Sequence, residues 1–251
     1  MSDDRGYERV AHLYDLFDRK ENLEFFFHYA SAAGEILDVG AGTGRIAIPL
    51  AERGIKIYCV EPSPAMRREF EKKLSRRSDL RENIALVAGD ASSFDFGRTF
   101  PAAFLSGSFD HFLDDDERLS SLRSIGRHLV ANGKLIFDVF LGLMRDSPLS
   151  PTGRVHVGDR EYRRFVATKV LANRMQETHL VFETYQDDRL LECLEERGTV
   201  GIITREELHG LLARAGFEVS HEFGNYDFSP FQEEGPLLIV EAEKVGSEKG
   251  G

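Results

Sequence analysis

A short apolar stretch that runs into three alternating glycines constrains the fold of this chain more than any other feature. Residues 35–39 (EILDV) are followed by Gly40, Gly42 and Gly44 and then by a segment with helical spacing. A strand that ends in such a turn lets the backbone approach a ligand closely, and the next helix begins with unpaired N–H groups. The sequence therefore predicts a nucleotide-sized binding site between a strand and the following helix.

The spacing of the glycines separates two kinds of ligand. A dinucleotide-binding turn needs a small residue three positions after its second glycine, where the helix packs against the strand. Here that position is Arg45, and the third glycine, Gly44, comes one residue too early. We expect Gly44 instead to leave room for an edge of the ligand. Asp38, at the end of the strand, suits an amino group or a sulfonium.

Acidic residues also follow the next two predicted strands. Glu61 follows the apolar residues 55–60, and Asp90 follows residues 84–88. The carboxyl ends of parallel strands meet at one edge of the sheet, so Asp38, Glu61 and Asp90 should converge on a single crevice. One carboxylate there suits a ribose diol, and another suits the exocyclic amino group of an adenine.

These motifs resemble those of the class I S-adenosylmethionine-dependent methyltransferases. The resemblance covers residues 35–140 and implies a Rossmann-like α/β fold: a doubly wound, mostly parallel seven-stranded sheet with an antiparallel edge strand. It implies S-adenosylmethionine as the cofactor, with Glu61 at the ribose and Asp90 beside the adenine. The predicted cofactor-binding residues are Tyr14, Asp38, Gly40, Ala41, Gly42, Gly44, Glu61, Pro62, Asp90, Ala91, Ser92, Ser106 and Phe109.

If the resemblance holds, residues 106–111, after the fourth predicted strand, lie beside the sulfonium. They lack the Asn/Asp-Pro-Pro-aromatic sequence of methyltransferases that act on nucleic-acid bases, and the chain lacks the paired glutamates of protein-arginine enzymes. His111 is the predicted catalytic residue because a histidine can act as a general base near neutral pH. The alternative is a solvated histidine in a loop. The predicted substrate-binding residues are Tyr14, Phe109, His111 and Tyr226.

Regular alternation of helices and strands stops after residues 135–139, and residues 153–200 have the pattern of successive β-segments. We therefore expect a cofactor-binding domain of residues 1–149 and 201–245, an inserted antiparallel lid of residues 150–200, and a disordered tail of residues 246–251. A dimerisation surface is the alternative role for the insertion.

Other segments have local signals for helices and strands. We expect one helix over residues 7–30 that lies across the top of the sheet, a turn at Asn132-Gly133, and helix starts at Ser63 and Thr204. Residues 217–223 and 236–243 are the last two predicted strands. The three acids at 114–116 suit a helix N-terminus better than a metal ion, and no metal site is predicted.

Composition and charge limit the classes of molecule that this protein is expected to bind. The 251 residues carry a formal net charge of −11, which disfavours a nucleic-acid partner. The chain begins without the charged-then-apolar layout of a signal peptide, and no apolar run approaches the length of a membrane span. We expect a cytoplasmic protein without a membrane partner. Its two cysteines, Cys59 and Cys193, are expected to be free thiols.

Taken together, these features predict methyl transfer to a nitrogen or oxygen of a small molecule by a monomer or homodimer. The weak signal for a base leans towards nitrogen, because a neutral amine can attack without one. Two other classes stay open. One is a nicotinamide-dependent reductase, although the dinucleotide glycine and a Tyr-x-x-x-Lys pair are missing. The other is a non-catalytic protein that binds S-adenosylmethionine.

Overall fold

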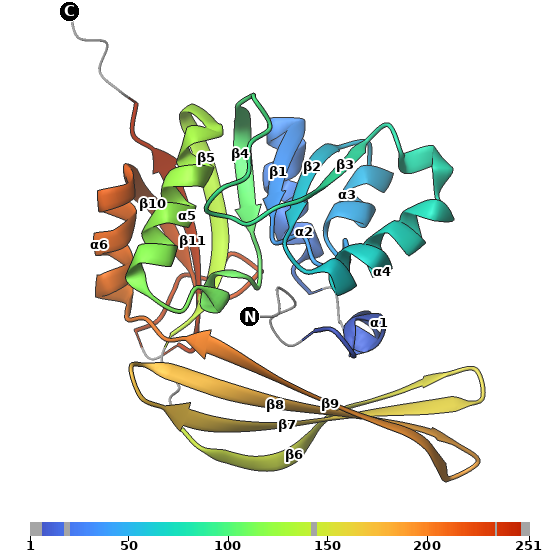
Figure 1. Cartoon of the computed structure of the whole chain (residues 1–251). Helices are drawn as coiled ribbons and strands as arrows, with labels where there is room; N and C mark the ends of the chain where they lie inside the picture. The colour runs from blue at the N-terminus through green and yellow to red at the C-terminus, as the bar shows by residue number, and fades with distance from the viewer. Residues whose placement is uncertain (1–6, 18–20, 142–144, 234, 247–251) are drawn as a thin grey trace, which may run out of the picture.

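The computed structural model describes residues 7–17, 21–141, 145–233 and 235–246. The chain forms a seven-stranded sheet covered by helices and a separate four-stranded sheet that lies beneath the ends of its strands (Figure 1). Within these residues, no helix is both long enough and apolar enough to cross a membrane. The predicted tail lies outside the described residues except for Gly246.

The seven-stranded sheet has the predicted doubly wound topology. Its strand order is β10-β11-β5-β4-β1-β2-β3. Strand β11 runs antiparallel to both of its neighbours, so β10 and β11 form an antiparallel hairpin at the β10 side of the sheet. The order reverses between β1 and β4, where open α/β sheets bind their ligands. The strands are β1 Glu35–Val39, β2 Lys56–Glu61, β3 Ile84–Ala88, β4 Phe100–Leu105, β5 Leu129–Phe140, β10 Phe217–Phe223 and β11 Leu237–Lys244.

Helices cover both faces of this sheet and form two buried cores. The core on one face includes Leu122 of α5 and Leu208 of α6, and that on the other includes Phe25 of α2 and Phe70 of α4. The helices are α2 Leu23–Ala33, α3 Ala47–Glu52, α4 Pro64–Ser75, α5 Asp115–Arg127 and α6 Arg205–Ala215, with 3-10 helices η2 Ser78–Leu80 and η3 Phe109–His111.

The local capping signals are confirmed. The Ser63 hydroxyl accepts a hydrogen bond from Met66 N at the start of α4, and Thr204 and Glu207 form a capping box at the start of α6. Asp114 caps α5, which confirms the helix-terminus interpretation of the acids at 114–116.

One prediction about secondary structure is wrong. The single helix over residues 7–30 is instead a short helix α1 Ala11–Tyr14, a 3-10 helix η1 Asp15–Phe17, and the separate α2. Its apolar residues are divided between two partners, since Leu13 packs on the smaller sheet and Phe25 on the larger one.

The turn predicted at Asn132-Gly133 is present as an irregularity within β5. Asn132 has φ 61°, and the register with β4 jumps between Leu129 and Lys134. The strand itself begins earlier than predicted, at Leu129.

The insertion is a continuous antiparallel sheet of strands β6 Ser147–Val157, β7 Arg160–Leu171, β8 Met175–Gln186 and β9 Arg189–Gly201. Strand β6 begins three residues before the predicted lid and has no alternating pattern, because its sequence starts SPLSPTG. The sheet crosses below the larger sheet, on the side of the carboxyl ends of its parallel strands (Figure 1).

Candidate cofactor and acceptor site

A pocket opens at the carboxyl ends of β1, β2 and β4. Its wall is formed by the glycine turn, the ends of three strands and the N-terminal segment. Of the residues predicted from the sequence, the pocket is lined by Tyr14, Asp38, Gly40, Ala41, Gly42, Glu61, Pro62, Asp90, Ala91, Ser106 and His111.

The glycine turn is held by the end of the neighbouring strand. Gly40 N and Ala41 N both donate to Val60 O, at 2.8 and 3.1 Å. Gly40 and Gly42 have φ of 74° and 58°, a region that favours glycine. A Cβ on Gly40 would lie 2.3 Å from the Ser108 Oγ, so the turn and the segment after β4 touch directly.

Glu61 connects the glycine turn to the start of α4. Its buried carboxylate accepts Gly42 N at 2.7 Å through Oε2 and Ser63 N at 2.8 Å through Oε1. Arg67 donates to the carbonyl oxygens of Glu61 and Pro62, each at 2.6 Å. One side chain therefore orders two backbone segments that line the same pocket.

Asp38 and Asp90 differ in their surroundings. Burial raises the pKa of Asp38 to about 7; Arg45 opposes this shift and the negative charge of Glu61 adds to it. The Asp90 carboxylate accepts Ser92 N at 2.9 Å and Ser92 Oγ at 2.7 Å. A ligand that brings positive charge to Asp38 would favour its ionised form.

Three aromatic side chains, Tyr7, Tyr14 and His111, contact one another in the pocket lining. The Tyr7 hydroxyl and His111 Nε2 are 2.8 Å apart. The Tyr7 ring makes edge contacts with His111 and Tyr14, with centroids 5.6 and 5.7 Å apart. Tyr7 was not predicted from the sequence, since a single tyrosine near the start of the chain belongs to no motif.

Four predicted site residues do not line the pocket. Gly44 packs against Phe70, whose ring would lie 2.4 Å from a Cβ at that position, so the expected room for a ligand edge is wrong. Phe109 is fully buried, and its ring packs in the core beside Phe112 and Phe137. Helix η3 turns this ring inward and leaves the neighbouring His111 at the pocket.

The other two residues lie behind the pocket wall. Ser92 is bonded to Asp90, and the Tyr226 hydroxyl donates to Asp138 Oδ2 at 2.8 Å. Conversely, the lining includes Thr43 and Arg45, which the sequence did not assign to the site. Arg45 follows the third glycine of the motif, where its size excludes a dinucleotide turn but gives no sign of a ligand contact.

The N-terminal segment joins both sheets beside the pocket. Val10 and Leu13 pack against Phe182 of β8, while Thr43 of the glycine turn donates to Asp15 Oδ1 at 2.6 Å. The backbone N–H of Arg9 donates to a carboxylate of β9 at 2.8 Å. Residues 7–17 therefore form part of the pocket wall and part of the support for the smaller sheet.

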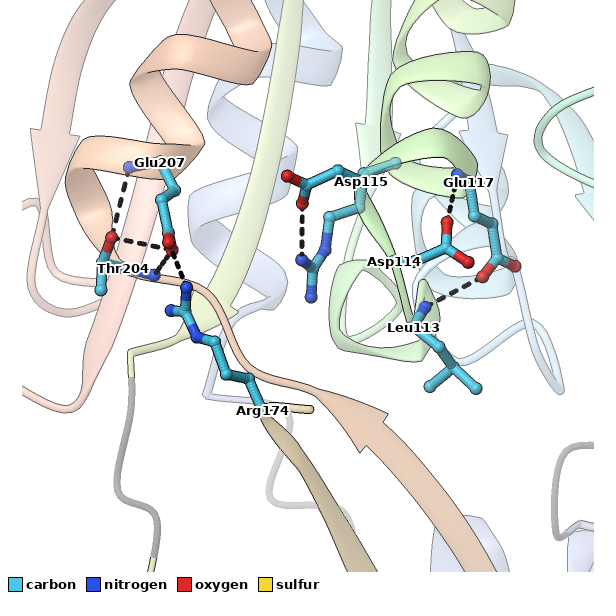
Figure 2. Close-up of polar contacts among 8 residues, drawn as sticks. Leu113, Asp114, Asp115, Glu117, Arg174, Thr204 and Glu207 are labelled. Carbon is cyan, nitrogen blue, oxygen red and sulfur yellow. Dashed lines mark hydrogen bonds and ion pairs between the residues drawn. The ribbon is translucent and has the colours of Figure 1, made fainter. Parts of the chain in front are cut away.

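A second junction connects the smaller sheet to α6 (Figure 2). Arg174, in the turn between β7 and β8, pairs with Glu207, whose Oε2 also accepts Thr204 N at 2.9 Å. Arg174 and the capping interactions lower the pKa of Glu207 to about 2. The acids at the start of α5 make helix-terminus contacts in the same view, and in the described part of the chain no three His, Cys, Asp or Glu residues form a group that could hold a metal ion.

Known proteins resemble this chain in sequence over its first half. Residues 36–133 match a family model described as a methyltransferase domain. An uncharacterized methyltransferase of Bacillus cytotoxicus is 28% identical over 142 residues, which cover 52% of this chain and 64% of that protein. The matched part thus spans less than two thirds of that relative.

Solved structures share the fold over most of the chain. An S-adenosylmethionine-dependent methyltransferase from Clostridium acetobutylicum superposes with a TM-score of 0.78 at 18% identity, covering 96% of this chain and 99% of that one. The sugar N-methyltransferase KedS8 from a Streptoalloteichus species superposes with a TM-score of 0.70 at 24% identity, covering 89% and 87%. Residues 36–133 therefore resemble a methyltransferase domain, and the chain shares the fold of these solved methyltransferase structures over most of its length.

Proposed function

We propose that this protein transfers a methyl group from S-adenosylmethionine to a nitrogen or oxygen of a small molecule, with nitrogen favoured. One observation carries the proposal: Asp38, Glu61 and Asp90, from three consecutive strands, line the same pocket as the glycine turn. The sugar N-methyltransferase KedS8, which has a similar fold, supports a small amine as the acceptor.

The carboxylates of the pocket are suitable acceptors for the hydroxyl and amino groups of this cofactor. We propose that Glu61 accepts the ribose hydroxyls, that Asp90 lies beside the adenine, and that Asp38 faces the amino group of the methionine part. Glu61 is positioned for this role by its two backbone N–H donors, which leave the carboxylate at the pocket. When bound, the cofactor supplies an electrophilic methyl group on a sulfonium.

His111 is proposed to take the proton of the acceptor, with Tyr7 holding the imidazole. Methyl transfer disperses positive charge, so the protein gains most from alignment and from excluding water. The 2.8 Å contact between the Tyr7 hydroxyl and His111 Nε2 fixes the ring beside the pocket, and Tyr14 packs edge-on against Tyr7. Tyr7 and Tyr14 form part of the pocket wall beside His111.

Replacing His111 with alanine should lower kcat by about 100-fold while S-adenosylhomocysteine affinity stays near that of the wild type, because general-base catalysis typically contributes that much. Steady-state kinetics with the best acceptor, together with calorimetric titration of S-adenosylhomocysteine, measure the two effects. His209→Ala is the matched control, since this histidine also pairs with a side chain but lies outside the pocket. An unchanged kcat for His111→Ala would exclude the imidazole as the base.

The stability of the ligand-free protein should depend on pH through the ionisation of Asp38. Its folded pKa of about 7 is above the usual 3.8, so protonated Asp38 stabilises the fold below pH 4, and this contribution is lost as the pH rises through 7. Asp38→Asn resembles the protonated form and should melt a few degrees above the wild type at pH 8, with a smaller difference at pH 5. Thermal melts across this range test it; an equal difference at both pH values would contradict the buried charge.

The same substitution, Asp38→Asn, should have an unfavourable effect on ligand binding. If Asp38 meets a positive group of the cofactor, Asp38→Asn will bind S-adenosylmethionine more weakly than the wild type despite its higher stability. A variant that is both more stable and equally tight in binding would remove Asp38 from the proposed cofactor contacts.

We further propose that residues 150–200 form a lid that shapes the acceptor chamber of a domain formed by residues 1–149 and 201–245. The contact of Leu13 with Phe182 supports this, because it joins the smaller sheet to the segment that carries Tyr7 and Tyr14.

We also propose that the protein is a cytoplasmic monomer or homodimer without nucleic-acid or membrane partners. The net charge of −11 supports the absence of a nucleic-acid partner.

The proposed function is tested by incubating the protein with S-adenosylmethionine and a panel of amines, amino sugars, hydroxyls and nucleic acids, and measuring S-adenosylhomocysteine release. We expect turnover with a small amine. Tight cofactor binding without turnover on any acceptor would favour a non-catalytic binding protein. Binding of NADH in place of S-adenosylmethionine would favour a reductase.

A further inference from the structure

A buried carboxylate lies directly behind one wall of the pocket. Asp138, near the end of β5, is 3% exposed and does not line the pocket. It accepts hydrogen bonds from the Ser106 hydroxyl at 2.9 Å, from the Tyr226 hydroxyl at 2.8 Å and from Gly107 N. Ser106 and Gly107 do line the pocket, so one side chain holds two wall residues from behind.

We propose that Asp138 and Tyr226 are positioning residues that hold the wall formed by residues 106–108 at the geometry needed for cofactor binding. This inference rests on the proposed function. Neither side chain lines the pocket, so both act through the wall. Tyr226, predicted from the sequence to bind the substrate, thus has a positioning role instead.

The wall is in direct contact with the glycine turn. The Ser108 hydroxyl donates to Gly40 O at 3.2 Å, and the approach is so close that a Cβ on Gly40 would overlap it. Movement of residues 106–108 would therefore displace the glycine turn, which also lines the pocket. Because packed segments of this kind shift together, a change at Asp138 should be felt as a loss of cofactor affinity.

The loop that carries Tyr226 is tied by backbone and ring contacts. Gly224 N donates to Ser229 O at 2.8 Å, which closes the loop on itself. Phe228 has φ 65°, a strained value for a bulky residue. Its ring packs on that of Phe25 in α2, with the two centroids 4.6 Å apart. Such strain persists where the surroundings impose it. The loop is thus fixed on α2 and presents the Tyr226 hydroxyl to Asp138.

A second side chain, Asn22, also contacts the wall. The Asn22 amide donates to the Ser106 hydroxyl at 3.5 Å, and Arg45 donates to Asn22 Oδ1 at 2.7 Å. Arg45 itself lines the pocket. A chain of polar contacts thus runs from Tyr226 through Asp138 and Ser106 to a side chain at the ligand surface.

The fold contains a matched pair for the control experiment. The Tyr29 hydroxyl donates to Glu241 Oε2 at 2.8 Å, the same distance as in the Tyr226 contact with Asp138. Glu241 is buried on the adjacent strand β11, at 4% exposed, and neither Tyr29 nor Glu241 lines the pocket. Tyr29→Phe and Tyr226→Phe each remove one tyrosine hydrogen bond to a buried carboxylate of the same sheet.

The test is calorimetric titration of S-adenosylhomocysteine into the wild type, Tyr226→Phe and Tyr29→Phe, with a thermal melt of each. Both variants should melt below the wild type, but only Tyr226→Phe should lose affinity, by roughly tenfold, near the lower end of what one hydrogen bond to a charged group contributes. Equal affinity in all three proteins, or an equal loss in both variants, would overturn the inference. A wild type that fails to bind S-adenosylhomocysteine would overturn the proposed function instead, and the inference with it.

Two substitutions of Asp138 complete the test. Asp138→Asn keeps an oxygen for Gly107 N, and its amide can donate to the two hydroxyls, so positioning predicts near wild-type affinity. Asp138→Ala removes all three contacts and should bind more weakly than Tyr226→Phe. If Asp138→Ala does not fold, the comparison of Asp138→Asn with the wild type remains. An asparagine variant weaker than Tyr226→Phe would show that the charge acts on the ligand and would refute a purely positioning role.

Discussion

Replacing Glu61 with alanine is expected to weaken S-adenosylhomocysteine binding by about 100-fold or more, the largest effect of any single substitution in the pocket. The substitution removes the proposed acceptor for the ribose hydroxyls. It also removes the acceptor of Gly42 N and Ser63 N, so the glycine turn and the start of α4 lose their common partner. The loss of ligand contact and the loss of order in the empty site act in the same direction.

The two contributions are separated by a second substitution. Glu61→Gln keeps one oxygen for a backbone N–H donor and loses the charge, so it should retain more stability than Glu61→Ala while still losing at least tenfold in affinity. Glu241→Gln is the control, because Glu241 is buried to a similar degree, at 4% against 5% exposed, and lies outside the pocket lining. Calorimetric titration and thermal melts measure both quantities. If Glu61→Ala binds S-adenosylhomocysteine as the wild type does, the proposed cofactor site is wrong.

The part of the site that comes from strand ends could be predicted because it depends on local sequence and on one rule of topology. Each of Asp38, Glu61 and Asp90 follows an apolar segment, and parallel strands present their carboxyl ends at one edge. Once the strands are recognised, the convergence of the three acids requires no knowledge of side-chain packing. The same is true of the helix caps at Ser63 and Thr204.

Contacts between distant segments could not be predicted in this way. The partners Tyr7 and His111 are 104 residues apart, and Tyr226 and Asp138 are 88 residues apart. Neither contact leaves a periodic or spacing signal in the sequence. The N-terminal segment was predicted as one helix because its apolar residues have helical spacing, but they serve two different surfaces. Tertiary packing overrode the local pattern there.

Gly44 shows how a residue can be recognised correctly and still be given the wrong purpose. Its position in the motif suggested room for a ligand, whereas the ring of Phe70 fills the space beside it. We therefore expect Gly44→Ala to lower the free energy of unfolding by about 2–4 kcal/mol, from a left-handed φ of 79° and from overpacking against a fully buried ring. Urea denaturation of the ligand-free protein measures the change.

Gly42→Ala is the matched control for this prediction. Gly42 has φ 58° in the same turn, but nothing lies within 4 Å of a Cβ at that position, so its substitution carries only the conformational cost, about 1–2 kcal/mol. Adding Phe70→Leu to Gly44→Ala should recover part of the overpacking energy, so the double variant should be more stable than the sum of the single effects implies. Equal destabilisation by Gly42→Ala and Gly44→Ala would mean that the ring moves aside freely. The third glycine would then be required by the backbone conformation of the turn and not by the contact between the turn and α4.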